Sequence, residues 1–425
     1  MSGTIENHWT LDDEREHFPC LMEWWSTQAF LKLKPKSEYW ILKATFTQWN
    51  KKMKYPGSLL NMIIYNPAEK KHYVYHNLDN KNKLESSEKG FEIKFEDSLV
   101  KGKFPKYIIY LHDKKNNIKI DLNYKSETSP HWIAQNISNG WLPMGFGQYR
   151  YGFIPRLKVD ADITFKKDKI KSSGIGYYEH VWGNFWYNNP LLGFRNFGKS
   201  ISTYTKLIGW WIKNHDIKIP NEIHLSSENS PFGYDWSWAF LDNGWSLFYG
   251  NILFWLKEGP APGILILCKG NNDYITFDKI QFYYNDIKKS KYYDFYYPTD
   301  FSLLAKKSKK EISINFKIQK EPREYVSKFT DKAFWKAFVI CEEQGAVNGY
   351  YKDNTGKINF KGIAKIEPQR QISILGHNTV DILIRKPPKE FGIDLEIDSN
   401  FFQKKIHGKF KLLPKPKICL KIINK

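Results

Sequence analysis

Apolar and polar residues alternate along much of the chain, with the period of two that a β-strand with one buried face produces. The clearest examples are Leu157–Phe165 and Ile312–Ile318, in which every second residue is apolar. The same pattern predicts strands at Tyr39–Thr47, Leu59–Tyr65, Tyr107–Leu111, Ile118–Tyr124, Tyr274–Tyr284, Ile358–Ile366, Thr379–Ile384 and Lys409–Leu413. Turn sequences such as Asp242-Asn243-Gly244 separate them. Many short strands at regular spacing predict an all-β fold, built as a sandwich or as barrels.

A short internal repeat indicates two similar lobes. Lys169–Glu179 and Lys357–Glu367, about half the chain apart, share Lys-Ile, then Gly-Ile after three residues, and a closing Glu. A chain of 425 residues also exceeds what one hydrophobic core usually supports. We therefore expect two tandem domains, at residues 1–215 and 216–425.

The stretch Gly183–Gly233 is the least strand-like part of the chain and predicts a partly helical insertion between the two domains. Apolar residues recur there at spacings of three and four, at Ile201, Tyr204, Leu207, Ile208, Trp211 and Ile212. Lys199, Lys206 and Lys213 flank this stripe. An amphipathic helix of this composition suits a membrane interface. We favour the other interpretation, a helix packed across two barrels.

Net charge and composition limit the classes of partner and the cellular compartment that the sequence favours. The net charge of +20 attracts anionic partners, either phospholipid head groups or nucleic acid. Nucleic acid is the less favoured partner, because no zinc-finger, RNA-recognition or helix-turn-helix pattern occurs. The sequence has no secretory signal, no apolar run near the ~20 residues of a membrane-spanning helix, and no CxxC pair among its 4 cysteines. We expect a cytoplasmic protein with, at most, a peripheral contact with an anionic membrane surface.

Aromatic residues make up 17% of the chain, and several gather around a histidine in Gly176–Gly183. Residues two apart in an extended strand share a face, so Tyr178, His180 and Trp182 are predicted to lie together, with Glu179 on the other face. His180 is a candidate proton donor or acceptor, and the ordinary alternative is a structural histidine bound to backbone. Glu179 is a second candidate, and its alternative is a carboxylate held by an arginine or by backbone donors.

Further aromatic faces predict the walls of a ligand site in the strands Tyr234–Phe240 and Leu247–Trp255. Barrels that hold ligands leave space lined by aromatic rings and a few polar groups. Aromatic faces also attract a carbocation by ~0.5–2 kcal/mol per contact. The predicted substrate-binding residues are Trp24, Trp25, Tyr178, Trp182, Trp236, Trp238, Tyr249 and Asn251.

Other kinds of site find no support in the sequence. His72 and His76 lie four apart on a strand-like segment without an acidic residue nearby, so we predict no metal site. No Gly-x-Ser-x-Gly elbow, dinucleotide-binding glycine pattern or phosphate loop occurs. Any chemistry is therefore expected to need no cofactor.

Three motifs in order give the chain a resemblance to a known family. Glu23-Trp24-Trp25, Gly176–Gly183 and Trp236–Gly244 resemble segments of the lipocalin-like (calycin) family that includes carotenoid 1,2-hydratase, or hydroxyneurosporene synthase. The resemblance spans about residues 20–255. It implies two tandem calycin-like antiparallel barrels with a large apolar pocket in or between them. It also implies hydration of acyclic carotenoids, or cyclisation of polyketide or isoprenoid chains.

The resemblance implies roles for individual residues as well. His180 and Trp182 match positions implicated in the hydratase. A later Tyr and Asp of the family correspond most closely to Tyr249 and to Asn251 or Asp235. Asn251 cannot protonate an alkene, which departs from the family pattern.

Together these features predict a cofactor-free hydratase or cyclase that acts on a long, unsaturated, isoprenoid-like substrate. His180, or a carboxylic acid such as Glu179 or Asp235, would protonate an alkene, and tryptophan rings would stabilise the cation. The main alternative is a lipid-binding protein of the lipocalin type that performs no chemistry, and a nucleic-acid binder is the second.

Overall fold

The computed structural model describes residues 9–17, 19–34, 38–49, 57–79, 83–87, 90–185, 194–214, 222–225, 233–251, 263–291, 296–319, 323–328, 337–372, 380–387, 391–399, 403–413, 415 and 417–424. These residues belong to two compact units. The first unit takes in most of the described chain up to Ile208, together with Cys268–Tyr274, and the second unit takes in the rest.

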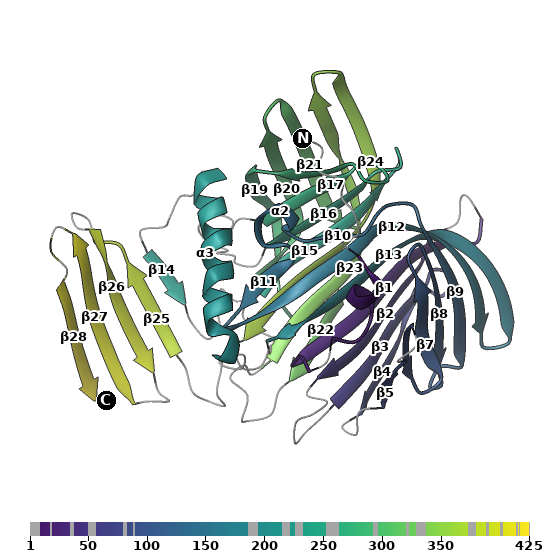
Figure 1. Cartoon of the computed structure of the whole chain (residues 1–425), viewed down its shortest axis with the longest axis horizontal. Helices are drawn as coiled ribbons and strands as arrows, with labels where there is room; N and C mark the ends of the chain where they lie inside the picture. The colour runs from purple at the N-terminus through teal and green to yellow at the C-terminus, as the bar shows by residue number, and fades with distance from the viewer. Residues whose placement is uncertain are drawn as a thin grey trace. The chain divides into compact units, whose positions relative to one another are not determined.

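The described strands of the first unit form one curled antiparallel sheet, in the order β4-β3-β2-β1-β13-β12-β9-β8-β7-β6-β5, with β10 and β11 paired to β12 (Figure 1). Along β12 the alternating apolar residues point into one core, as at Leu157, Val159 and Ile163. The strands are β1 (Met22–Lys32), β2 (Trp40–Trp49), β3 (Gly57–Asn66), β4 (Lys71–Asp79), β5 (Leu84–Ser86), β6 (Phe91–Phe95), β7 (Ser98–Lys103), β8 (Lys106–Asp113), β9 (Ile118–Ser126), β10 (His131–Trp132), β11 (Trp141–Met144), β12 (Gly147–Phe165) and β13 (Asp168–Asn184).

The second large sheet has the order β18-β17-β16-β15-β24-β23-β21-β20-β19, with β22 paired to β23, and a smaller sheet has the order β14-β25-β26-β27-β28. The large sheet carries a second core, to which Tyr249, Phe301 and Ile366 belong. The strands are β14 (Glu222–Leu225), β15 (Gly233–Leu241), β16 (Ser246–Asn251), β17 (Gly263–Cys268), β18 (Tyr274–Phe277), β19 (Lys279–Lys289), β20 (Tyr296–Lys307), β21 (Lys310–Ile318), β22 (Arg323–Lys328), β23 (Ala337–Asp353), β24 (Gly356–Ile372), β25 (Val380–Arg385), β26 (Phe391–Ser399), β27 (Lys404–Leu413) and β28 (Lys417–Asn424).

The helices are few in the described part of the chain: α1 (Leu11–Glu14), α2 (Gln135–Ser138), the 3₁₀ turn η1 (Phe194–Asn196) and α3 (Phe197–Asn214). The prediction of an all-β fold of two tandem antiparallel barrels with a partly helical insertion is confirmed, and each barrel is formed by one of the two large curled sheets. One predicted strand, Tyr274–Tyr284, is divided between β18 and β19. The predicted Leu247–Trp255 is seen as β16 up to Asn251, and Leu253 and Trp255 lie outside the described residues.

The internal repeat corresponds to equivalent strands in the two large sheets. β13 and β24 each have 17 residues, and each pairs with the strand just before it and with the first strand of its sheet, β1 or β15. Gly174 lies opposite Leu31, and Gly362 lies opposite Leu241. A Cβ atom at Gly174 would lie 1.9 Å from the carbonyl oxygen of Phe30, and one at Gly362 would lie 2.0 Å from that of Phe240. The repeat therefore keeps a glycine where the neighbouring backbone comes close.

Alanine at either of these glycines should destabilise the protein. The added methyl group would collide with a backbone carbonyl oxygen, and such overpacking costs about 1–3 kcal/mol. Gly209→Ala is the control, because nothing lies within 4 Å of a Cβ there, and alanine in a helix should stabilise by about 0.5–1 kcal/mol. Urea unfolding of the whole chain measures the shifts. Equal midpoints for Gly174→Ala, Gly362→Ala and Gly209→Ala would contradict the close approach.

Helix α3 buries only part of the predicted apolar stripe. Leu207 and Trp211 are buried, but Ile201, Ile208 and Ile212 are exposed. The start of the helix is held on β12 and the turn before it by polar contacts, in which the Ser200 and Tyr204 hydroxyls donate to the carbonyl oxygens of Gly147 and Gly145 at 2.8 and 3.2 Å. Polar residues thus take part of the buried face, and isoleucines of the stripe point outward. No described helix is both long and apolar enough to cross a bilayer, and contact with an anionic membrane stays a prediction.

Candidate functional site

The segment Gly176–Gly183 lies in β13, where it pairs with β1. Trp25 is opposite His180, and Glu23 is opposite Trp182. Because side chains alternate along both strands, these four residues and Tyr178 point to the face that carries the core of the first unit. Tyr178, His180 and Trp182 therefore share the inner face of the sheet, as their spacing predicts.

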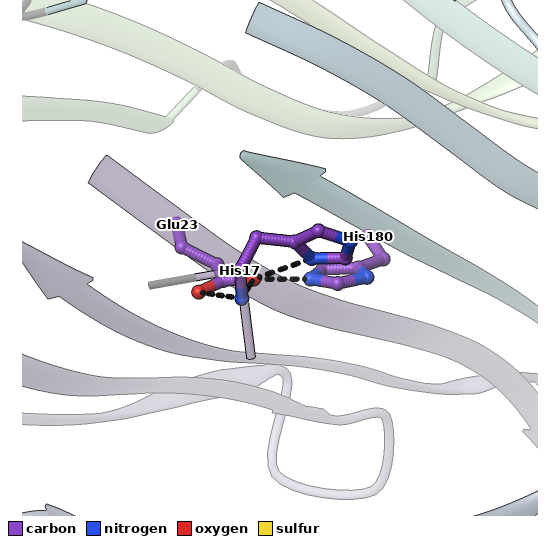
Figure 2. A group of neighbouring side chains, drawn as sticks. All are labelled: His17, Glu23 and His180. Atoms are coloured by element: carbon purple, nitrogen blue, oxygen red, sulfur yellow. Dashed lines mark hydrogen bonds and ion pairs between the residues drawn. The ribbon is translucent and has the colours of Figure 1, made fainter. Parts of the chain in front are cut away.

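Two histidines share one carboxylate, that of Glu23 (Figure 2). His180 Nε2 lies 2.9 Å from Glu23 Oε1, and His17 Nδ1 lies 3.1 Å from the same oxygen. Gln48 Nε2 donates to Glu23 Oε2 at 3.0 Å. The side chains of Glu23 and His180 are fully buried, and that of His17 is 22% exposed. We call these residues the His17–Glu23–His180 cluster.

Neighbouring rings and a carbonyl group fix the two imidazoles. The ring of His17 stacks on Trp182 with 3.7 Å between centroids, and the ring of His180 stacks on Trp25 at 4.8 Å. His180 Nδ1 lies 2.7 Å from the carbonyl oxygen of Asp13, so Nδ1 carries a proton and donates it. The Nε2 atom of His180 is thereby aimed at Glu23.

Burial and hydrogen bonding shift the pKa values of Glu23 and His180 from their ordinary values. Burial alone would raise the pKa of Glu23, but hydrogen bonds from His17 and His180 outweigh it, and the pKa lies below its ordinary value. Burial lowers the pKa of His180. The hydrogen bond that lowers the pKa of Glu23 needs a proton on His180 Nε2, whereas burial acts against a ring that is protonated at both nitrogens.

A second buried carboxyl group, that of Glu14, lies at the end of α1. Its Oε1 accepts hydrogen bonds from Trp9 Nε1 at 3.0 Å, from the backbone N–H of Phe104 at 3.1 Å, and from the Tyr107 hydroxyl. Glu14 is only 1% exposed. Its Oε2 is buried and has no hydrogen-bond partner within the described part of the chain. One oxygen thus collects three donors while the other has none.

Tyr178 packs against Tyr107 and Trp9, which both donate hydrogen bonds to Glu14, and it adds a second unpartnered atom. Its ring stacks on Tyr107 at 4.9 Å and meets Trp9 edge-on. Among the described residues, its hydroxyl has no hydrogen-bond partner, and neither has the buried Trp132 Nε1. Leaving such atoms unpaired costs about 1–3 kcal/mol each, so folded proteins rarely do so. These three atoms lie around one aromatic core, and a ligand or water molecule there would give them partners.

The acid–base properties of Glu14 follow from this environment. Burial raises its pKa above the ordinary 4.5, although its hydrogen bonds and the charge of Lys103 act in the opposite direction. Burial also raises the pKa values of Tyr107 and Tyr178 well above their ordinary value. Glu14 is therefore held toward its protonated form, next to a neutral Tyr178 hydroxyl.

Glu179, the other predicted catalytic residue of this strand, lies on the opposite face from His180. It accepts hydrogen bonds from Trp24 Nε1 at 3.1 Å and from the hydroxyls of Tyr151 and Tyr177. Trp24 is accordingly separated from Trp25, which lies on the inner face. The repeat places Glu367 at the position of Glu179, where Glu367 accepts a hydrogen bond from Tyr234 at 2.7 Å. A carboxylate bound to an aromatic residue of the first strand thus occurs in both units, which favours a structural role.

The predicted residues of the second unit also divide between two faces. Asp235 and Asn251 share the face of Tyr249, which belongs to the second core, and Trp236 and Trp238 lie on the other face. Asp235 Oδ1 lies 2.8 Å from Arg370 in an ion pair in which both side chains are 2% exposed. Substrate binding by these residues, and by Trp24, stays a prediction.

Several residues of the site were not predicted from the sequence. Trp9, Glu14 and His17 belong to a short segment before the first strand, where nothing in the local pattern indicates burial. Glu23 could have been found, because it is two residues from Trp25 in a strand and therefore shares its face. Tyr107 was predicted only as part of a strand.

Comparison with known proteins gives a fold and no family. No family model and no curated protein matches the sequence. A crystal structure of a candidate AttH protein from Nitrosomonas europaea is similar, with a TM-score of 0.56 and 15% identity over 85% of this chain and 96% of that one. Kievitone hydratase from Nectria haematococca is also similar, with a TM-score of 0.52 and 12% identity over 86% of this chain and 94% of that one. The chain therefore shares the lipocalin-like two-barrel fold of these proteins.

Proposed function

We propose that the first unit adds water to a carbon–carbon double bond of an apolar, unsaturated substrate. The observation that carries the proposal is the Glu14 carboxyl group, which is buried, has a raised pKa, and lacks a partner for Oε2 among the described residues. The Tyr178 hydroxyl is similarly unpartnered among the described residues, and its ring stacks on Tyr107, which donates to Glu14. The name of kievitone hydratase, which shares the fold, adds support for this class of reaction.

In the proposed reaction, protonated Glu14 donates the proton of Oε2 to one alkene carbon. A carbocation forms at the other carbon, where the faces of Tyr178 and Trp25 stabilise it. Water held by the Tyr178 hydroxyl attacks the cation, and the proton that it loses returns to the Glu14 carboxylate. The steps consume one water and one alkene and regenerate the acid, so they need no cofactor. His180 is less suited to be the acid, because burial lowers its pKa and its Nε2 faces Glu23.

The aromatic composition of this core favours a long, isoprenoid-like substrate. An extended polyene offers contact to many rings, and a tertiary cation formed from it is the kind that ring faces stabilise. The rings in contact with Glu14 or Tyr178 are those of Trp9, Trp25, Phe91 and Tyr107. Trp132 stacks on Trp9, and Trp182 packs edge-on against Trp132. If an internal alkene captured the cation in place of water, the product would be a ring and not an alcohol.

Reaction in heavy-oxygen water tests the class of reaction. Organic extraction of the purified protein followed by mass spectrometry identifies bound ligands, and unsaturated members of that set serve as substrates. We expect one heavy oxygen per product molecule. A cyclised product without label would replace hydration with cyclisation, and bound ligand that is never converted would support the alternative of a lipid-binding protein.

Activity should fall as pH rises through the raised pKa of Glu14. The groups that face it are Lys103, Tyr107 and Tyr178, and burial outweighs the opposing effect of the lysine. The acid is active when protonated, so kcat/KM should be constant at low pH and should decline on an alkaline limb that lies above 4.5, the ordinary value. Stability should change in the same direction, since a group with a raised folded-state pKa loses its favourable contribution as pH increases. A decline of kcat/KM with an apparent pKa at or below 4.5 would contradict the role of Glu14 as the acid.

A further inference from the structure

We infer that the His17–Glu23–His180 cluster binds one divalent first-row transition-metal ion. One nitrogen from each histidine and one carboxylate oxygen lie within 4.8 Å of one another. Figure 2 shows both imidazole rings on the same side of the Glu23 carboxylate, with a ring nitrogen of each turned toward it. This inference is separate from the proposed hydration, none of whose steps uses these atoms.

The two nitrogens of His180 supply the first argument. Nδ1 faces the carbonyl oxygen of Asp13 at 2.7 Å, and Nε2 faces Glu23 Oε1 at 2.9 Å. Both neighbours are acceptors, so a neutral ring that donates from Nδ1 points the lone pair of Nε2 at an oxygen lone pair. A proton on either of the two atoms, or a metal ion bound by both, makes that contact favourable.

The surroundings of the cluster favour the metal ion over the proton. In metal sites, the ligating histidine usually donates its other N–H to a backbone carbonyl or carboxylate, as His180 does to Asp13. Ligating carboxylates are likewise hydrogen-bonded by outer residues, and Gln48 supplies this bond to Glu23 Oε2.

The distances fit neighbouring ligands of one ion. Metal–nitrogen and metal–oxygen bonds of about 2.1 Å place adjacent ligand atoms of an octahedral site about 3 Å apart. The observed separations from Glu23 Oε1 are 2.9 Å to His180 and 3.1 Å to His17. Two imidazoles with one carboxylate are a donor set for zinc or ferrous iron, not for calcium or magnesium. His17, at 22% exposed, gives the ion access to solvent.

Such an ion would join three separate parts of the chain. His17 lies just after α1, Glu23 in β1 and His180 in β13. His17 follows Glu14 by three residues in the sequence. Metal binding would thus hold the segment that carries Glu14 against the sheet.

Metal analysis of the full-length protein tests the inference. The protein is stripped with a chelator, titrated with Zn²⁺, dialysed and measured by mass spectrometry of the metal. We expect one zinc per chain, and Co²⁺ in its place should give visible absorption bands. Gln48→Ala should weaken zinc binding about 10- to 100-fold, and His17→Ala and Glu23→Gln should weaken it further. His112→Ala is the matched control, because His112 pairs with Asp97 outside the cluster, and its zinc content should equal that of the wild type.

Two results would overturn the inference. One is wild-type protein that retains no zinc after dialysis. The other is a nitrogen NMR signal showing that both ring nitrogens of His180 stay protonated in the presence of Zn²⁺. Both are read from the wild type, so they do not depend on whether a variant folds. Hydration by metal-free protein would leave the proposed reaction in place, whereas a metal-loaded but inactive Glu14→Gln variant would support both proposals.

Discussion

Replacing Glu14 by glutamine should lower turnover by about 10²- to 10⁴-fold, the usual contribution of a positioned general acid. Glutamine keeps a carbonyl oxygen that can accept from Trp9, Phe104 and Tyr107, as Glu14 Oε1 does. It replaces the carboxyl proton with an amide that cannot protonate an alkene. The buried site disfavours charge, so a neutral amide should leave stability unchanged or raised at neutral pH. The measurement is product formation per enzyme, with urea unfolding on the same samples.

Two further variants make that result specific to Glu14. Glu85→Gln is the control, because Glu85 is an exposed residue of β5, and it should react at the wild-type rate. Tyr178→Phe should retain the ring that stacks on Tyr107 but lose the hydroxyl that orients water. It should therefore lower the rate less than Glu14→Gln. Wild-type turnover in the Glu14→Gln variant would remove Glu14 from the mechanism, whatever the substrate.

The faces of the strands could be predicted from the sequence because they depend on a local rule. A period of two fixes which side chains of one strand lie together, and it placed Tyr178, His180 and Trp182 correctly without knowledge of any neighbouring strand. The same rule separates Glu179 from His180. It also separates Trp24 from Trp25, so these two predicted substrate-binding residues lie on opposite faces of the strand.

The residues that contact these faces could not be predicted, because they lie in segments without a regular alternation of apolar and polar residues. Thr10 and Asp13 form a capping box, a pattern that marks the start of a helix and does not indicate burial, yet Glu14 in the same turn is buried. Only the hydrogen bonds from Trp9 and from Tyr107, in β8, show why. His17 likewise meets Glu23 through a turn whose geometry is not encoded in apolar spacing.

The repeat shows that two ligands of the His17–Glu23–His180 cluster are specific to the first unit. The repeated glycines align the two units, so that Gly174 corresponds to Gly362 and Leu31 corresponds to Leu241. Counting along both strands, Gly233 and Pro368 stand where the first unit has Glu23 and His180, and Asp235 stands where it has Trp25. The second unit therefore has neither cluster ligand at these two positions. Its own buried polar group is centred on Asp235.

Replacing Asp235 by alanine should destabilise the protein by about 3–5 kcal/mol, the cost of leaving one member of a buried ion pair without its partner. Arg370 would remain buried, with its guanidinium held near carbonyl oxygens but without a carboxylate. The Tyr284 hydroxyl, which donates to Asp235 Oδ2 at 2.7 Å, would also lose its acceptor. Urea unfolding of the whole chain, followed by tryptophan fluorescence, should show a lower midpoint.

A double variant separates this structural role from the catalytic role predicted for Asp235. Asp235→Leu with Arg370→Met removes both charges together, and it should recover much of the stability lost in Asp235→Ala, because apolar replacement of a buried pair is often neutral. If Asp235 only stabilises the second core, the double variant should also convert substrate at close to the wild-type rate. A stable double variant with no activity would instead return Asp235 to the reaction, and would place a catalytic acid in the unit that lacks the His17–Glu23–His180 cluster.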